Sequence, residues 1–250
     1  MSSNNPFDQF DIEHLSASSI NLFIQDIPLF IVRYLAKHKS PTNPAMLRGT
    51  VIDHAIGNKT SVAEAQKEFM ALMNYEKKQG NVFDQEKAET EYNNIEKYLE
   101  VGIPFYKKLG EPVSYQKKVE LQYEDLPIKF LGFVDMEYSD CIRDIKTTAK
   151  RPSALLPPVQ RQIALYGSAL EKHAYADYLY VTKTKAEVIT FEVDDINMRL
   201  NEVYRVASAM MNLLQNNDIN SLVDQFYPDF SNWMWSDSDR AVAKELWRIK

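Results

Sequence analysis

The sequence predicts a mixed α/β fold, and three observations lead to this prediction. The expected elements run in the order helices, three strands, a helix, two strands and further helices. Hydrophobic residues make up 45% of the 250 residues and charged residues 26%, as in globular proteins that bury their own core. Only 7 residues are glycine, which favours helices with few loops. We expect a single domain over 1–250, with a helical insertion near 60–110 and a C-terminal helical extension over 194–250.

Helical spacing of apolar residues dominates the first 110 residues. Ser16 or Ser18 is placed to cap a helix that extends to His38, and Pro28 should kink or divide this helix. Further helices are expected over 45–56, 61–78 and 84–109. The charged outer faces of the last two helices indicate an inserted region rather than the centre of the fold.

The pattern changes to strands after Pro112. Strands are expected over 113–123, 128–138 and 141–147, then a helix over 159–173, and then a hairpin of strands over 176–182 and 187–193. Asp194 or Asp195 should cap the next helix, and Ser236 or Ser238 the final one.

Charge and cysteine content exclude several classes of protein. With 35 acidic and 29 basic residues, the net charge of −6 disfavours a protein that coats nucleic acid through bulk positive charge. The single cysteine, Cys141, excludes an intramolecular disulfide and a four-cysteine zinc or iron–sulfur cluster. The first residues do not resemble a secretory signal, and no apolar run has the length of a membrane helix. We therefore expect a cytoplasmic protein with no membrane partner.

The segment 132–146 contains the side chains with the clearest chemistry. If a two-residue loop at 139–140 joins two strands, Asp135 lies opposite Asp144 with Cβ atoms about 5 Å apart. Two like charges there destabilise a sheet unless a cation lies between them, and oxygen ligands suit Mg²⁺ or Mn²⁺. Lys146 falls on the same face as Asp144. This set can bind a metal ion and position a water. In the alternative interpretation, Asp-x-Lys is a common strand pattern whose acid caps backbone groups.

Asp135 followed by Asp144-Ile145-Lys146 resembles the signature of the PD-(D/E)XK nuclease superfamily, and especially its RecB-like or lambda-exonuclease-like branch. Three further segments are similar to that branch in order and spacing: LSASSINLFIQDIPLFIVRYL, RGTVIDHAI, and DIKTT followed by RQIALYG. The resemblance extends over about 15–193, and the ordered set is more specific than any single motif. It implies a restriction-endonuclease-like α/β core, in which a mixed central β-sheet is flanked by helices.

The resemblance implies roles for individual residues. Asp135, Asp144 and Lys146 would form the catalytic set. Asp135 and Asp144 would be metal ligands, the Ile145 carbonyl would be a further ligand, and Lys146 would position the attacking water. Glu120 matches a family acid whose role is less certain, and a solvated strand residue is its alternative interpretation.

Other residues are candidates for DNA binding. Gln162 and Tyr166 lie four residues apart, hence on one helix face, and the resemblance implies that they contact DNA near the scissile phosphate. Six basic and two acidic residues occur between 141 and 172. From this local excess we take Lys150, Arg151 and Arg161 as phosphate contacts. A solvated helix face is the alternative interpretation of these basic residues.

The sequence departs from the family pattern at one position. The family histidine usually follows the glycine by four residues. Counted from Gly49, that position is Asp53, and His54 comes one residue later. One step along a helix rotates a side chain by about 100°, so the two cannot face the same metal ion. Asp53 has the spacing and His54 has the residue type, and both stay candidate ligands.

The resemblance implies a Mg²⁺- or Mn²⁺-dependent deoxyribonuclease that hydrolyses phosphodiester bonds. An exonuclease that processes DNA ends in recombination, repair or replication is the leading hypothesis. The alternatives are a structure-selective endonuclease and a non-catalytic DNA-binding or assembly module that has kept the fold. Residues 57–60 do not form a P-loop, so no motor is expected. A single-strand annealing protein, a helicase or another recombination partner would supply processivity, and a phage-encoded enzyme would act in the host cytoplasm.

Overall fold

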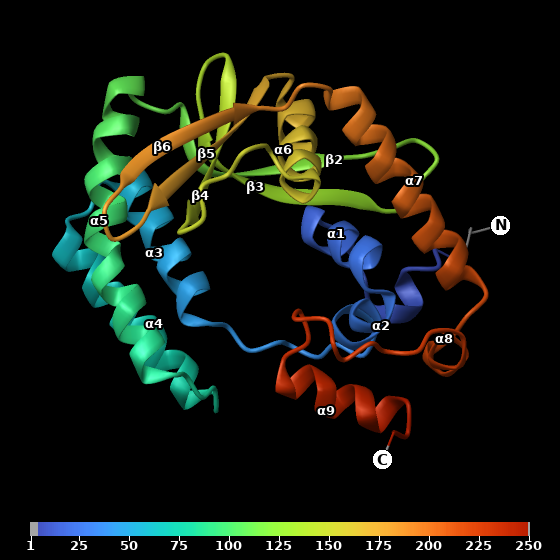
Figure 1. Ribbon diagram of the computed structural model, residues 1–250. Coiled ribbons are helices and arrows are strands. Elements are labelled where there is room, and N and C mark those ends of the chain that lie inside the picture. Colours follow the sequence, from blue (N-terminus) through green and yellow to red (C-terminus); the bar gives the residue numbers. More distant parts are fainter. Residues whose placement is uncertain (1–4, 250) are drawn as a thin grey trace. The chain divides into compact units, whose positions relative to one another are not determined.

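The computed structural model describes residues 5–249 and divides them into two compact units (Figure 1). The first unit contains the described residues up to Pro41, Val119–Gly132 and the chain from Asp195 onward. The second unit contains Thr42–Lys118 and Phe133–Asp194. The divisions near 118 and 132 therefore fall within strands β2 (Ser114–Leu121) and β3 (Lys129–Glu137).

The first unit is mainly helical. Its helices are α1 (Ala17–Gln25), α2 (Ile27–Phe30), a π-helical turn (Ile31–Leu35), α7 (Ile196–Gln215), α8 (Ile219–Gln225) and α9 (Asp237–Leu246), with a short 3₁₀ turn at Asp8–Phe10. The short strand β1 (His14–Leu15) pairs in parallel with residues 129–130 of β3. The sequence predicts none of the 3₁₀ turn, β1 and α8, but it predicts the other helices. The seven residues of α8 are too few for a periodic signal.

Side-chain caps set the helix boundaries in the first unit. Ser16 forms a capping box with Ser19 at the start of α1. The expected break near Pro28 occurs at Asp26, which ends α1 and accepts a hydrogen bond from the Leu29 N–H at the start of α2. Pro28 then occupies the first turn of α2, where its missing N–H has no intrahelical partner to lose.

An ion pair ties two segments of the first unit that are distant in sequence. Arg33 in the π-helical turn donates to both carboxylate oxygens of Asp239 in α9, at 3.2 and 2.7 Å. Ser236 and Ser40 also donate to Asp239, at 2.6 and 2.7 Å. Burial alone would raise the pKa of Asp239, but these hydrogen bonds, led by Arg33, outweigh it and lower the pKa to about 2.

The second unit contains a mixed β-sheet, as the sequence predicts. Strand β3 is antiparallel to β4 (Cys141–Thr148), β4 is parallel to β5 (His173–Val181), and β5 is antiparallel to β6 (Ala186–Glu192). Strand β2 also pairs with β3. The parallel pair is joined by a helical crossover through α6 (Pro157–Leu170), as parallel neighbours require.

Helices flank the sheet of the second unit on both faces. In α5 (Gln85–Leu109), Tyr106 donates a hydrogen bond to Asp177 of β5, whereas Gln162 of α6 contacts Asp144 of β4. Asp177 is paired with Ile145, the neighbour of Asp144, and adjacent residues of a strand point to opposite faces. Helices α5 and α6 therefore cover opposite faces, and the predicted mixed sheet with flanking helices is confirmed.

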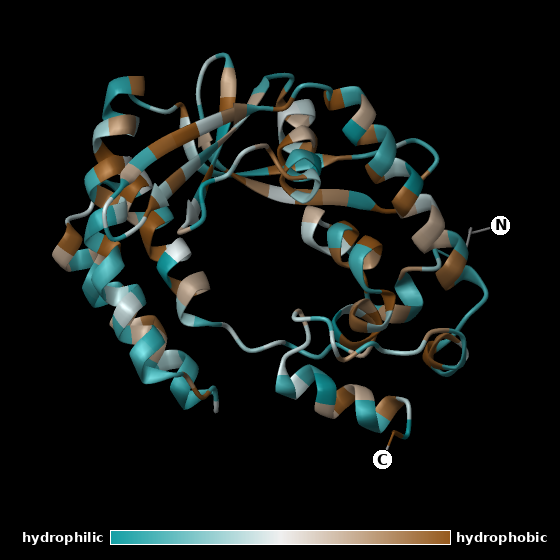
Figure 2. Cartoon of the chain, viewed as in Figure 1, coloured by the Kyte–Doolittle hydropathy of each residue, from teal (hydrophilic) through white to brown (hydrophobic). Residues whose placement is uncertain are grey.

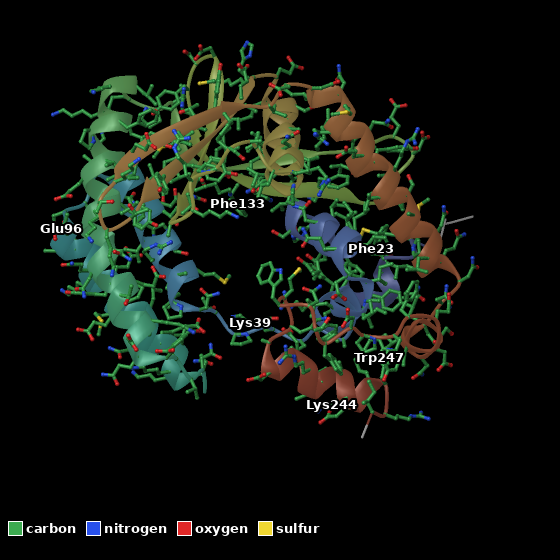
Figure 3. The ribbon with its side chains drawn as sticks, in the orientation of Figure 1. Phe23, Lys39, Glu96, Phe133, Lys244 and Trp247 are labelled. Atoms are coloured by element: carbon green, nitrogen blue, oxygen red, sulfur yellow. The ribbon has the colours of Figure 1, made fainter. Side chains whose placement is uncertain are left out.

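Helices α3 (Pro44–Asn58), α4 (Val62–Lys78) and α5 pack against one another, and the expected helices over 45–56, 61–78 and 84–109 are all present. In Figure 2, α4 and α5 are coloured largely as hydrophilic residues, with hydrophobic residues interspersed. Tyr98 and Leu99 of α5 belong to the buried core, whereas Glu96, labelled in Figure 3, is exposed. Within residues 5–249, none of the helices combines the length and apolar character that a membrane crossing requires.

The boundary between α6 and β5 differs from the sequence prediction. The helix ends at Leu170 rather than near His173, because Glu171 adopts a left-handed conformation with φ 54°. Strand β5 then begins at His173. Gly167 permits this close return of the chain, since a Cβ there would lie 2.8 Å from the Lys172 carbonyl oxygen. Glu171 is not a glycine, so nothing in the sequence marks it as the left-handed residue that ends the helix.

Candidate active site

The hairpin of β3 and β4 has the register that the sequence predicts. Met136 pairs with Arg143, and the two strands meet at a two-residue loop over 139–140. Asp135 and Asp144 are the next facing positions. The regular ladder ends there, so the two acids lie where the strands begin to separate.

A side chain replaces the backbone ladder at this point. The Ile145 N–H donates to Asp135 Oδ2 at 2.7 Å instead of to a backbone carbonyl of β3. Burial and the nearby carboxylates of Asp144 and Asp53 raise the pKa of Asp135 well above its ordinary value. Asp135 thus lies in surroundings that favour either a proton or a cation.

Asp144 is 1% exposed and is held by residues of β4 and α6. Its Oδ2 lies 2.6 Å from Lys146 Nζ, and its Oδ1 accepts a hydrogen bond from Gln162 Nε2 at 3.1 Å. Gln162 Oε1 in turn accepts from Lys146 Nζ at 3.1 Å. One glutamine side chain therefore joins the lysine to the buried carboxylate.

Lys146 carries its charge inside this network. Burial alone would lower the pKa of Lys146, but the charge of Asp144 and the hydrogen bond to it, with Asp135 further away, raise the pKa above its ordinary value. The ammonium form is therefore the form present at neutral pH. A fixed positive charge beside two carboxylates can hold a phosphate oxygen or orient a water.

Asp53 joins this group from α3. Its Oδ2 accepts hydrogen bonds from Gln116 Nε2 at 2.6 Å and from the Tyr115 hydroxyl at 3.3 Å. Burial is the largest of several influences and raises the pKa of Asp53 to about 6, with Asp144 adding a smaller repulsion. The structure thus brings Asp53 together with Asp135 and Asp144.

His54 points to a different neighbour. Its Nδ1 lies 2.7 Å from Glu68 Oε1 of α4, and 41% of its side chain is exposed. Because Asp53 and His54 are one residue apart on α3, their side chains point in directions about 100° apart, as expected. Of the two alternatives that the sequence left open, the structure places Asp53 beside the other acids and His54 outside the group.

Gln116 is a site residue that the sequence prediction missed. Its Nε2 also donates to Asp135 Oδ1 at 3.0 Å, so the amide bridges two of the acids. Glu120, the β2 acid singled out from the sequence, instead forms an ion pair with Lys129 at 3.0 Å in the first unit. No sequence signal marks Gln116, because a glutamine in a strand ordinarily faces solvent.

The residues expected to bind DNA occupy different environments. Lys150 is exposed, and Arg151 is exposed but paired with Glu187 at 3.0 Å. Tyr166 is only 8% exposed, and its hydroxyl lies 3.4 Å from Gln162 Nε2. Arg161, which the sequence suggested as a phosphate contact, is only 7% exposed. The 3.6-residue period turns Arg161 to the inner side of α6, together with Leu165.

The donor set of this group fits a hard divalent cation. One of its buried oxygens, Asp53 Oδ1, accepts no hydrogen bond, and the buried Asp144 Oδ2 is held by the ammonium group of Lys146. Carboxylate oxygens with repelling charges are the environment that Mg²⁺ or Mn²⁺ stabilises. Within residues 5–249, however, no three His, Cys, Asp or Glu side chains lie close enough together to hold a metal ion as they stand.

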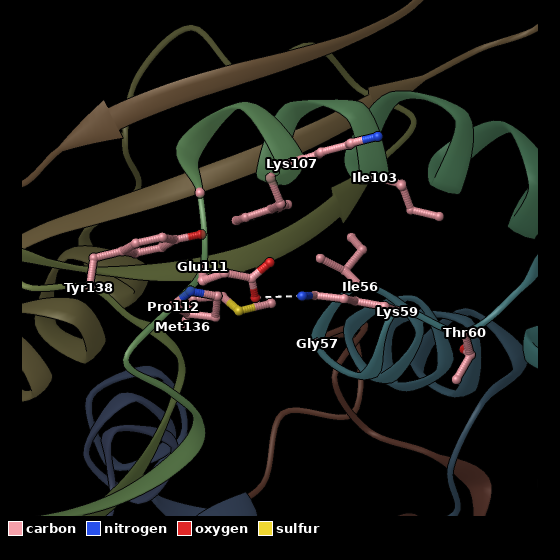
Figure 4. Close-up of a pocket in the computed structure, with 12 residues that line it drawn as sticks. Ile56, Gly57, Lys59, Thr60, Ile103, Lys107, Glu111, Pro112, Met136 and Tyr138 are labelled. Atoms are coloured by element: carbon pink, nitrogen blue, oxygen red, sulfur yellow. Dashed lines mark hydrogen bonds and ion pairs between the residues drawn. The ribbon is translucent and has the colours of Figure 1, made fainter.

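The second unit also has a cavity of about 360 Å³ away from these acids (Figure 4). Ile103 and Met136 line its apolar wall, and Lys59 and Glu111 form an ion pair beside it. Met136 alternates with Asp135 along β3 and faces the other way. The cavity is therefore separate from the acidic group.

Comparisons with known proteins indicate a shared fold. No family model and no curated protein matches the chain. A crystal structure of a "putative exonuclease" from Eubacterium rectale is similar, with a TM-score of 0.57 and 14% identity, over 96% of this chain and 92% of that one. A structure of the protein SSO0001 matches with a TM-score of 0.38 and 14% identity, over 86% of this chain and 96% of that one. The chain therefore shares the fold of the Eubacterium rectale protein.

Proposed function

We propose that the protein is a Mg²⁺- or Mn²⁺-dependent deoxyribonuclease of the PD-(D/E)XK superfamily, in its RecB-like or lambda-exonuclease-like branch. The observation that carries this proposal is the convergence of Asp135, Asp144 and Lys146 at the open end of the β3–β4 hairpin. The ordered motifs over 15–193 add support. So does the fold shared with the Eubacterium rectale protein, which is described as a "putative exonuclease".

In this proposal Asp135, Asp144 and the Ile145 carbonyl hold the metal ion, with Asp53 as the ligand from α3. When bound, the metal lowers the pKa of a water and screens the phosphate charge. Lys146 keeps its proton on Nζ, because its pKa is raised. Its ammonium group orients the attacking water and stabilises the negative charge that develops on the phosphate oxygens.

Two exposed side chains are proposed to hold the substrate. Lys150 follows β4 and offers a positive charge to the phosphate backbone. Phe133, labelled in Figure 3, is 49% exposed and shares a face of β3 with Asp135, two residues away. An exposed aromatic ring beside a hydrolytic site can stack on a base of the strand that is cut.

Cleavage of DNA with and without free ends tests the proposal. End-labelled linear DNA and a closed circle are incubated with Mg²⁺, Mn²⁺ or a chelator, using the wild type, Lys146→Ala and the control Lys108→Ala. Lys108 is an exposed lysine of α5 outside the site. We expect metal-dependent loss of the linear DNA alone, a fall of at least about 100-fold in Lys146→Ala, and no change in the control.

The other outcomes identify the alternatives. Cleavage of the closed circle, or preference for flapped DNA, would indicate a structure-selective endonuclease. DNA binding without cleavage under any metal would indicate a non-catalytic binding or assembly module and would contradict the proposed activity. Equal cleavage by wild type and Lys146→Ala would remove Lys146 from the chemistry.

A further inference from the structure

Gln116 has a backbone conformation that strands rarely contain. Its φ is +50°, in the left-handed region that few non-glycine residues adopt. In a regular strand, consecutive side chains point to opposite faces. Here the consecutive residues Tyr115 and Gln116 both reach Asp53, at 3.3 and 2.6 Å. The left-handed residue breaks the alternation of β2, as in a β-bulge, and so directs the amide to the acids.

The amide of Gln116 reduces the repulsion between two carboxylates, as a cation between them would. Its Nε2 donates one hydrogen bond to Asp53 Oδ2 and one to Asp135 Oδ1, at 2.6 and 3.0 Å. An amide nitrogen has two N–H donors, and both are used here. The bridge offsets repulsion between two carboxylates, but it leaves Asp53 Oδ1 without a hydrogen bond. The amide therefore satisfies only part of the hydrogen-bonding capacity of the two carboxylates.

The same amide nitrogen is incompatible with a shared metal ion. An N–H group donates and has no lone pair for a cation, so it cannot remain between two oxygens that coordinate the same ion. Within residues 5–249, no three acids have the spacing of a metal centre, as expected where an amide takes the place of a cation between two of them. A cation must therefore displace the amide before Asp53 and Asp135 bind it together.

We propose that Gln116 is a placeholder for the divalent cation: its amide holds Asp53 and Asp135 together in the metal-free protein, and the cation displaces it. Gln116 is thus a positioning residue that sets the affinity for the metal. This inference rests on the proposed metal-dependent function. It adds that the Gln116 amide and the cation compete for the same two carboxylates. Because of this competition, the apparent affinity for the metal equals the intrinsic affinity multiplied by the fraction of molecules in which the amide does not bridge the acids.

Metal binding in variants of Gln116 tests this inference without measuring activity. Gln116→Met keeps the length of the side chain but removes the donor, and Gln116→Gly removes the side chain and accepts the left-handed backbone. Gln79→Met makes the same chemical change at an exposed position beyond α4 and serves as the control. Mn²⁺ binding to the full-length proteins is measured by titration calorimetry, with thermal unfolding of the metal-free forms alongside.

We expect both Gln116 variants to bind Mn²⁺ more tightly than the wild type, by about tenfold if the amide bridges the acids nine-tenths of the time. Without metal, Gln116→Met should unfold at a lower temperature, because two repelling carboxylates lose their bridge. Gln79→Met should match the wild type in both measurements.

Weaker or unchanged Mn²⁺ binding in both Gln116 variants would overturn the inference. Weaker binding would show that Gln116 itself assists the metal, and unchanged binding would show that the amide does not compete. If the wild type binds Mn²⁺ and only this comparison fails, the proposed function stands. If neither the wild type nor any variant binds Mn²⁺, the inference and the metal-dependent function fail together.

Discussion

Gln162 shows how the structure changes the role proposed for a single residue. The resemblance implies that it contacts the DNA strand, whereas the structure places its amide between Lys146 Nζ and Asp144 Oδ1, each at 3.1 Å. A glutamine is suited to this place because it accepts from the ammonium and donates to the carboxylate at once. Its first effect should therefore be to orient the catalytic groups.

The substitution Gln162→Ala separates these two roles. We expect the cleavage rate to fall by about 10- to 100-fold, as for residues that orient metal ligands. The affinity for DNA, measured by fluorescence anisotropy with Ca²⁺ in place of Mg²⁺, should change by less than about twofold. A large loss of DNA affinity with little change in rate would instead favour the DNA contact.

Asp239 gives the first unit a stability that depends on pH. Its pKa is lowered to about 2, mainly because hydrogen bonds from Arg33, Ser236 and Ser40 overcome its burial. A lowered pKa stabilises the folded state above the ordinary value near 3.9 and ceases to do so as the pH falls toward 2. The shift corresponds to about 2 kcal/mol at neutral pH.

We therefore expect Asp239→Asn to lower the free energy of unfolding by about 2 kcal/mol at pH 7. The difference from the wild type should shrink as the pH falls from 4 to 2. Asp237→Asn is the matched control, since Asp237 lies in the same helical turn with a fully exposed side chain. Urea unfolding at pH 7 and pH 2.5 makes the comparison. A pH-independent difference would show that the charge of Asp239 is not the cause.

At the scale of elements, the packing of β2 against α3 positions the acid of the helix. Tyr115 of β2 lies over Gly57 near the end of α3, and a Cβ at Gly57 would come within 2.2 Å of the Tyr115 ring. The Tyr115 hydroxyl then donates to Asp53 on the same helix. A glycine at position 57 is thus required by close approach rather than by an unusual backbone angle.

Gly57→Ala should force the Tyr115 ring away from α3. We expect a loss of about 1–3 kcal/mol in the free energy of unfolding, as for other overpacked sites, together with weaker Mn²⁺ binding. Gly80→Ala, at an exposed loop position with open space around it but φ +91°, reports the effect of backbone strain without a clash. Equal Mn²⁺ affinity in Gly57→Ala and wild type would contradict the role of Tyr115 in positioning Asp53.

At the scale of the whole molecule, one of the two units holds the entire candidate site. Asp53, Gln116, Asp135, Asp144 and Lys146 all lie within Thr42–Lys118 and Phe133–Asp194. The net charge of the chain is −6, so under the proposed function the site would depend on local positive charge rather than on the field of the whole protein to attract DNA.

Binding of Mn²⁺ to the folded state should raise the midpoint of thermal unfolding. At 100 times the dissociation constant, the gain is about 2.7 kcal/mol, or roughly 5–10 °C for a chain of this size. Calorimetric scans with Mn²⁺ and with a chelator measure it. Asp144→Asn should abolish most of the rise, and an equal rise in that variant would place the metal elsewhere.

The sequence by itself determined the features that depend on local order. Most strand and helix positions, the pairs of candidate caps that include Ser16, Asp195 and Ser236, and the register that opposes Asp135 to Asp144 follow from residues close together in the chain. A two-residue loop leaves one register, so the opposition of the two acids was predictable.

Only the tertiary structure decided which distant residues meet these acids. The packing of α3, β2 and α6 around β4 decides these contacts. It places Asp53 rather than His54 beside the other acids, puts Gln116 between two of them and buries Arg161. Such contacts join residues 18 to 63 positions apart. Local periodicity indicates which face of a helix is apolar, but not which strand that face will meet.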